Sequence, residues 1–433
     1  MPGIMMPNRL LVFCVILVSF GVGFFKASAY HAADGFQVRT GIAPGNSEPF
    51  LHSHFASSRR HIQAHASSLI ELKDGRIRAF WFSGSREGAR DVEIHSAVFD
   101  PALGQWGTEQ TVASREGTQQ SLLRYVSKLG NPVAGRAADG TLWLYYVTVS
   151  MGGWAGSSIT AMTSLDEGET WSPARRLITS PFLNISTLVK GASFLYGDGT
   201  MGLPVYHEFI SKFGEILRLD KNGVVIDKQR LTAGGGGALQ PVVLVKNPSD
   251  ALVLMRYSGA VSPRRVISVA TRDAGQHWTA PVKSALSNPD AALSALVLPD
   301  GRMLAVLNNQ EQGRDALSLV ISVDGGVSWK TVYQLEDQLA ARRQPLDESA
   351  YRKVIAGLAR DTEAKIADAG EYAESAKRQA CTEHGCRFEF SYPYLIQAQS
   401  GDFHLVYTWN RSFIKHVWFT QAWLDQRLQE SRP

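Results

Sequence analysis

One eight-residue pattern, Ser/Thr-x-Asp-x-Gly-x-x-Trp, occurs three times in the chain, each time after an apolar run that indicates a strand. The copies span residues 164–171, 271–278 and 322–329. The Asp can accept hydrogen bonds from turn amides, the Gly permits unusual backbone angles, and the Trp can pack the turn against its neighbour. Degenerate copies begin at Asp100 and Asp220. These copies predict a repeat of roughly 50 to 65 residues, the length of a four-stranded propeller blade, and about six blades fit the chain.

The rest of the chain supports an all-β fold. Short β-branched or aromatic runs alternate with Asp-Gly turns in three clear cases, at residues 68–82, 139–147 and 296–307. A strand, an Asp-Gly turn and a second strand form the signature of a hairpin. Many short strands without alternating helices favour a sandwich, barrel or propeller, and the repeat selects a six-bladed β-propeller.

One stretch, about residues 335–380, departs from this pattern. It is rich in Ala, Glu, Arg, Lys and Asp, and it carries apolar residues at helical spacing, among them Tyr351 and Ile355. We expect one or two amphipathic helices inserted before the last blade. Two roles remain open for them: a solvated helical hairpin on the rim of the propeller, or a lid over its central cavity.

The N-terminus indicates export. Arg9 precedes an apolar stretch, Leu10 to Phe25, which is followed by Lys26 and the small triplet Ala27-Ser28-Ala29. This is the layout of a signal peptide over residues 1–29, with an uncleaved anchor helix as the alternative. We therefore expect a secreted or periplasmic protein with no membrane association after cleavage, an N-terminal extension over 30–60 and a propeller over 61–425.

Charge and cysteine content exclude several classes of partner. The chain has 44 Lys and Arg against 40 Asp and Glu, so no nucleic-acid partner is expected. Cys381 and Cys386 flank a short Gly-containing loop and are expected to form a disulfide. His52, His54, His61 and His65 match no standard ligand spacing, so no metal is expected, and no nucleotide-binding motif indicates a cofactor.

Together these features resemble the sialidase (neuraminidase) superfamily over about residues 60–425. The boxes correspond to the Asp boxes of that superfamily. The resemblance places carboxylate-binding arginines at Arg86, Arg256 and Arg314, the nucleophile at Tyr392 and the general acid/base at Asp91. Guanidinium groups suit such a clamp because they bind a carboxylate through two hydrogen bonds and stay charged. A neutral phenol suits the nucleophile because it is not repelled by the sugar carboxylate.

Two positions depart from the superfamily pattern. His65 stands where the first arginine is expected, and Gln240 stands where a glutamate would activate the tyrosine. His65 could replace the arginine as a cation or act as a neutral base. Glu208 is the candidate base for Tyr392, with His207 second. His65, Gln240, Tyr206 and His207 are expected to contact the substrate.

Three functions are compatible with these residues. The first is an exo-acting glycoside hydrolase on a sialic or related acidic sugar, acting as a monomer. The second is a uronic-acid lyase, in which the arginines neutralise the carboxylate while His65 or Tyr392 removes the adjacent proton. The third is a glycan-binding propeller without catalytic activity.

Overall fold

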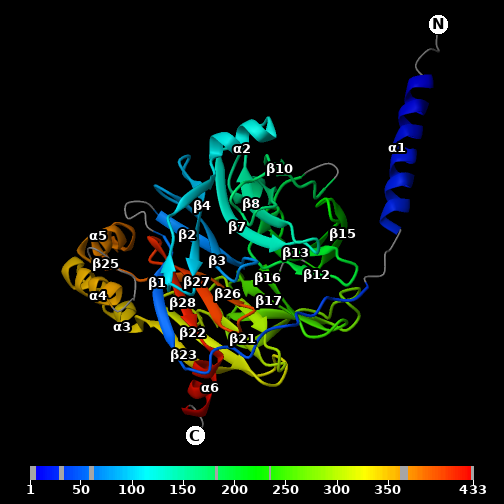
Figure 1. Cartoon of the computed structure of the whole chain (residues 1–433). Helices are drawn as coiled ribbons and strands as arrows, with labels where there is room; N and C mark the ends of the chain where they lie inside the picture. The colour runs from blue at the N-terminus through cyan, green and yellow to red at the C-terminus, as the bar shows by residue number, and fades with distance from the viewer. Residues whose placement is uncertain are drawn as a thin grey trace.

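The fold follows from the repeat. We examined a computed structural model that describes residues 6–28, 34–57, 63–180, 184–233, 236–360 and 369–430. Six antiparallel sheets surround one axis and form a six-bladed β-propeller (Figure 1). Strands of each blade contact those of the next blade along the chain, and the sixth blade contacts the first. The predicted fold class is confirmed.

Each blade has four main strands, ordered from the innermost to the outermost. Blade 1 contains β2 (Gln63–Glu71), β3 (Ile77–Gly84), β4 (Glu93–Asp100) and β5 (Gln105–Trp106), with β6 (Gln110–Ala113) on β4. Blade 2 contains β7 (Lys128–Arg136), β8 (Leu142–Val149), β9 (Ser157–Ser164) and β10 (Arg175–Arg176). Blade 3 contains β11 (Leu188–Val189), β13 (Met201–His207), β14 (Phe213–Leu219) and β15 (Val225–Arg230), with β12 (Phe194–Leu195) on β13.

The second half of the ring repeats this arrangement. Blade 4 contains β16 (Ala238–Val245), β17 (Ala251–Tyr257), β18 (Arg265–Thr271) and β19 (Val282–Ser287). Blade 5 contains β20 (Ser294–Val297), β21 (Met303–Leu307), β22 (Ala316–Ser322) and β23 (Lys330–Asp337). Blade 6 contains β26 (Phe390–Gln397), β27 (Phe403–Trp409), β28 (Phe413–Phe419) and β1 (Leu51–Phe55).

Blade 6 closes the ring with strands from both ends of the propeller. β1, from the N-terminal side, pairs antiparallel with β28 from Leu51 opposite Phe419 to Phe55 opposite Lys415. The chain cannot open the junction between blades 6 and 1 without breaking this pairing. Apolar side chains of both blades pack across the junction, among them Trp81, Phe99 and Tyr394.

The three Asp boxes form hairpin turns between the third and fourth strands of blades 2, 4 and 5. In the first box, Ser164 Oγ accepts from Gly168 N at 2.8 Å and Asp166 Oδ1 accepts from Thr170 N at 2.9 Å. The other boxes repeat these bonds. Because neighbouring strands run antiparallel, the boxes lie on the face opposite to the starts of the innermost strands. They brace the blades and contribute nothing to that other face.

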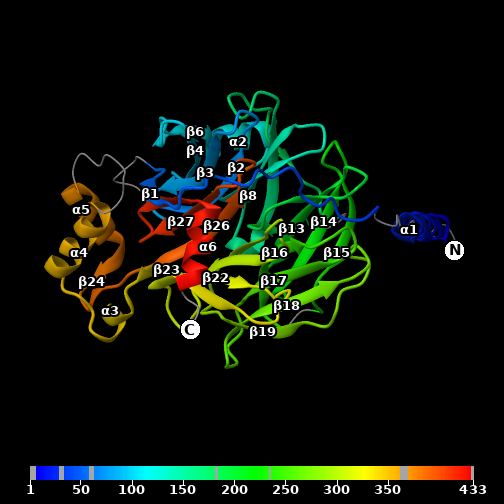
Figure 2. The same cartoon turned by 60° about the horizontal axis from the view of Figure 1, so that its bottom comes forward.

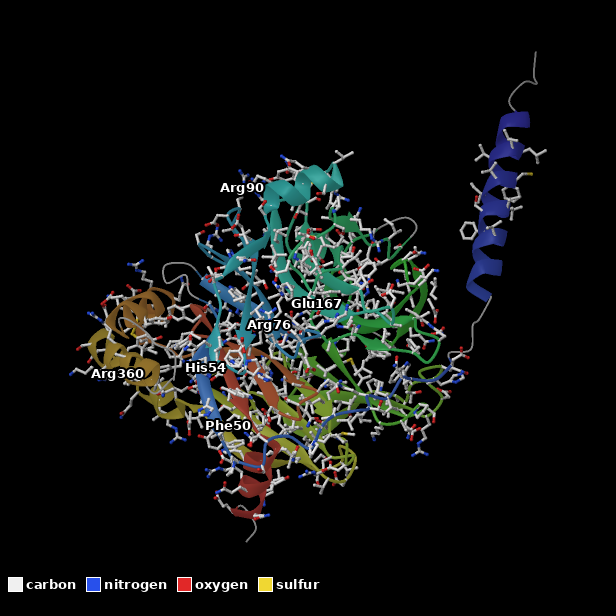
Figure 3. All side chains as sticks on the ribbon, in the orientation of Figure 1. Phe50, His54, Arg76, Arg90, Glu167 and Arg360 are labelled. Atoms are coloured by element: carbon white, nitrogen blue, oxygen red, sulfur yellow. A yellow bond between two sulfur atoms is a disulfide. The ribbon has the colours of Figure 1, made fainter. Side chains whose placement is uncertain are left out.

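The predicted insertion is helical. It comprises α3 (Leu339–Arg343), α4 (Glu348–Arg360) and α5 (Ala369–Ala380), followed by the two-stranded β24 (Cys381–Thr382) and β25 (Gly385–Cys386). Tyr351, Ile355 and Tyr372 pack into the apolar core of blades 5 and 6. These helices lie at the outer rim of the propeller in both views, where Arg360 marks α4 (Figures 2 and 3). Of the two roles left open for the insertion, its position agrees with a helical hairpin on the rim. The expected disulfide joins Cys381 to Cys386.

The remaining helices lie outside the blades. They are α1 (Met6–Ser28), α2 (Arg115–Leu122), the 3-10 turn η1 (Trp154–Gly156) and α6 (Gln421–Glu430). α1 stands clear of the propeller (Figure 1). Within the described residues, no helix combines the length and the apolar character required to cross a membrane.

Candidate functional site

A non-glycine residue with left-handed backbone angles lies at the start of the innermost strand in every blade. The six residues, with φ between 41° and 64°, are Ala66, Asn131, Ser186, Gln240, Asp290 and Tyr392. In four blades this residue sits in a β-bulge, where the register shifts within β2, β7, β16 and β26. Such angles are uncommon for residues other than Gly and concentrate at functional sites. Their recurrence defines one face of the ring as the candidate site.

Side chains of blades 2 to 5 form a hydrogen-bonded chain on this face. Asn131 Nδ2 and Gln240 Nε2 donate to the hydroxyl of Tyr206, at 3.1 and 3.3 Å. Arg256 donates through Nη1 to Gln240 Oε1 at 3.3 Å and through Nε to Asp290 Oδ1 at 2.6 Å. Gln240 is thus an intermediary between a phenol and a guanidinium. Burial raises the pKa of Tyr206 well above its usual value, so its hydroxyl stays neutral.

This hydrogen-bonded series of side chains continues through blades 5, 6 and 1. It contains two more arginines, Arg314 and Arg411. Arg314 donates to the carbonyl oxygen of Asp290 at 2.8 Å and to Glu389 Oε1 at 3.0 Å. Arg411 donates to Glu389 Oε2 at 2.6 Å and to Glu87 Oε2 at 3.1 Å. Burial alone would raise the pKa of Glu389, but Arg411 and Arg314 lower it to about 2. One ionised carboxylate therefore orients two of the three arginines.

Tyr392 lies next to His65, with ring centroids 4.4 Å apart. Tyr392 is half-buried, whereas His65 is 1% exposed. Burial, reinforced by the positive charge of Arg411, lowers the pKa of His65 to about 3. His65 is therefore neutral near pH 7 and does not supply the missing cation. That positive charge comes instead from Arg411, on the connection between β27 and β28.

Two other predicted residues, Glu208 and His207, differ in where their side chains lie. Glu208 lies in the connection between β13 and β14 on the site face, and burial raises its pKa. Its backbone N–H donates to Ser186 Oγ at 2.9 Å. His207 instead contacts Glu215 Oε2 at 3.0 Å and stacks on Phe213, which directs its ring along β14.

Arg86 and Asp91 belong to the connection between β3 and β4, and both are exposed. Asp91 accepts two hydrogen bonds from Ser85, each of 2.9 Å. In this connection, the side chain that takes part in the hydrogen-bonded series is that of Glu87. Sequence reasoning missed Glu87, Glu389 and Arg411, although one signal could have revealed Arg411. Arg256, Arg314 and Arg411 all occur where the second strand of a blade meets the third.

Among the residues that the structure describes, no group of three or more His, Cys, Asp or Glu could hold a metal ion. His61, one member of the histidine series in the sequence, lies outside the described residues. The three guanidinium groups on the site face are paired with Asp290, Glu389 and Glu87.

Comparison with known proteins agrees with this architecture. A family model described as a BNR repeat-like domain matches residues 75–405. No curated protein sequence matches the chain. Among solved structures, the Hadza microbial sialidase has a TM-score of 0.60 at 16% identity, over 83% of this chain and 66% of that one, just under two thirds of its length.

This chain covers almost the whole length of two further solved structures. The intramolecular trans-sialidase from Ruminococcus gnavus has a TM-score of 0.59 at 12% identity, over 92% of this chain and 99% of that one. A protein of unknown function from Dyadobacter fermentans has a TM-score of 0.61 at 12% identity, over 85% and 98%. At these identities the likeness concerns the fold. The family match extends over most of the chain, which therefore belongs to the BNR repeat-like domain family.

Proposed function

We propose that this protein is an exported, sialidase-like exo-glycosidase that acts as a monomer on a glycan ending in an acidic sugar. The observation that carries the proposal is the hydrogen-bonded network that joins Arg256, Arg314 and Arg411 through Asp290 and Glu389, on the same face as Tyr392. Arg256 is electrostatically coupled to Tyr392, and Arg314 and Arg411 to its neighbour His65. Three guanidinium groups beside one half-buried phenol form a site for a carboxylate next to a nucleophile.

In the proposed reaction, the arginines hold the sugar carboxylate and Tyr392 attacks the anomeric carbon. The phenol oxygen forms a bond to that carbon while the glycosidic C–O bond breaks. Glu208 accepts the phenol proton, and Asp91, carried over by resemblance, gives a proton to the leaving oxygen. Water then hydrolyses the glycosyl-tyrosine in the second step. Burial raises the pKa of Glu208, which makes its carboxylate a better proton acceptor than an exposed one.

The test uses the chain from residue 30 onwards and a fluorogenic sialic acid glycoside. We expect release of the fluorophore by the wild type and none by Tyr392→Phe, with equal melting temperatures as the control for folding. A panel of uronic-acid polysaccharides, followed in the near ultraviolet, runs in parallel. An unsaturated product there, without fluorophore release, would replace hydrolysis by elimination. Calorimetric binding of sialic acid without any turnover would support a binding module instead.

A further inference from the structure

Lys190 is a buried cation that the proposed reaction does not use. It follows β11 in blade 3, and its side chain reaches blade 6, on the opposite side of the ring. Nζ donates to the carbonyl oxygen of Pro393 at 3.2 Å. The same atom lies 5.9 Å from the centroid of the Tyr392 ring and 5.0 Å from that of Tyr394. Lys190 thus lies beneath the bulge that presents Tyr392.

This amine has an unusual environment for a lysine. The residue is 4% exposed, and none of the ion pairs among the described residues includes it. Buried ammonium groups ordinarily have a carboxylate partner, because desolvation disfavours an isolated charge. Here burial lowers the pKa of Lys190 to about 7. A buried ionisable group that titrates near neutrality and lies beside a candidate nucleophile is a candidate functional group.

We propose that Lys190 is a positioning residue for Tyr392, supplying positive charge beneath its ring that favours the phenolate over the phenol. A nucleophilic phenol can be activated by a base that takes its proton or by a cation that stabilises its anion. Gln240 cannot be the base. The Lys190 ammonium does not take the proton, which leaves to Glu208 or to solvent. The inference rests on the proposed function only in treating Tyr392 as the nucleophile.

Other charges surround the same position and must be kept constant in any test. His65 packs on Tyr392 and is neutral, while Arg256 is coupled to Tyr392 from blade 4. Arg411, Glu389 and Arg314 act on His65 from blades 5 and 6, and Lys190 itself also acts on His65. Among the described cations, Lys190 alone lies over the ring itself and contacts the backbone of the residue that follows it. Substitutions at position 190 therefore isolate its contribution.

Nitration by tetranitromethane measures phenolate content without any substrate. The rate at Tyr392, obtained from peptide fragment masses that separate it from Tyr394, is divided by the rate at half-exposed Tyr125. Lys190→Gln keeps a hydrogen-bond donor for Pro393 but removes the charge, whereas Lys190→Arg keeps both. Because the Lys190 ammonium lies 5.9 Å from the centroid of the Tyr392 ring and a nearby cation favours a phenolate, we expect the ratio, measured below pH 7 where Lys190 is charged, to fall on the order of tenfold in the Gln variant and to persist in the Arg variant. An unchanged ratio in Lys190→Gln, or equal losses in both variants, overturns the proposal.

The wild type gives a second test that needs no variant. Lys190 carries its charge below its pKa, so the Tyr392 to Tyr125 ratio should fall as pH rises through about 7. A ratio that stays constant or rises overturns the proposal even if the variants fail to fold. Nitration is also independent of turnover. If the nitration ratio depends on the charge at position 190 but no fluorophore is released, the role of Lys190 is retained and the glycosidase is rejected. If fluorophore is released but the ratio does not depend on that charge, the glycosidase is retained and the role of Lys190 is rejected.

Discussion

Glu389 shows how one side chain organises the site. Its two carboxylate oxygens accept from Arg314 and Arg411, so both guanidinium groups are fixed before any ligand arrives. Preorganised arginines cost less conformational entropy on binding than free ones. A substrate carboxylate would then bind through the N–H groups that the network leaves available. The site is thus a paired cationic cluster rather than an isolated positive patch.

The first prediction compares Arg411 with Arg86, the arginine that the sequence suggested. Arg411→Ala removes a guanidinium held by Glu389 and Glu87, and a hydrogen bond to a charged group is worth about 1.5–3 kcal/mol. We expect the affinity for free sialic acid, measured by calorimetry, to fall roughly tenfold to a hundredfold. Arg86→Ala is the matched control and should leave the affinity unchanged. The opposite ranking would return Arg86 to the site.

The second prediction concerns Gln240, which stands between Tyr206 and Arg256. Gln240→Glu would replace the amide donor to the Tyr206 hydroxyl by a carboxylate beside Arg256. Arg256 would then have two carboxylate partners, since it already donates to Asp290. We expect the affinity for sialic acid to fall severalfold, because the new charge competes with the sugar carboxylate. Calorimetry measures this change, with Gln105→Glu, at an exposed position, as the control. Tighter binding by Gln240→Glu would contradict the prediction.

Sequence reasoning singled out Arg256, Arg314, Gln240 and Tyr392 because each is next to a strand or box with a recognisable pattern. It could not locate the partners of these residues. Arg411 contacts Glu87 across 324 positions, and Lys190 contacts Pro393 across 203. Contacts of this kind depend on the closure of the ring, and they leave no periodic trace in the sequence.

Between elements, a buried ion pair joins blades 5 and 6. Glu336 on β23 accepts from Lys415 Nζ on β28 and from the Tyr407 hydroxyl on β27, both at 2.6 Å. The side chains of Glu336 and Lys415 are 3% and 9% exposed. We expect Glu336→Ala to lower the free energy of unfolding by about 3–5 kcal/mol, because Lys415 would remain buried without a partner. Chemical denaturation measures this loss, and exposed Glu383→Ala should show none.

The strands themselves were largely predictable, since hairpins and boxes are local patterns with fixed spacing. The insertion was predictable as helix from its amphipathic spacing, and its contacts with blades 5 and 6 were not. The pairing of β1 with β28 was also beyond the sequence, because Leu51 and Phe419 share a ladder that no local pattern announces. Closure of the ring therefore depends on contacts between distant segments, and these contacts lie at the junction of blades 6 and 1.

Three buried histidines occupy the junction where blade 6 meets blade 1. His54 belongs to β1 and is marked in Figure 3, while His404 and His416 belong to β27 and β28. His416 Nδ1 accepts from Trp106 Nε1 of blade 1 at 3.3 Å, so its Nε2–H is assigned as donor to His404 Nδ1 at 3.1 Å. Burial lowers the pKa of His404 to about 3 and that of His416 well below its usual value. The closed ring therefore requires neutral imidazoles at His404 and His416.

This requirement gives the propeller a defined response to acid. Between about pH 6.5 and pH 3 the unfolded chain binds a proton at His404 that the folded chain does not, so stability should fall as pH decreases through this window. Each such histidine contributes a slope of up to about 1.4 kcal/mol per pH unit. His404→Phe keeps an aromatic ring beside Trp418 but cannot titrate. Whatever its effect on absolute stability, it should flatten the dependence of the melting temperature on pH, whereas exposed His384→Phe should not. Parallel curves for wild type and His404→Phe would show that protons enter the folded ring without opening the junction.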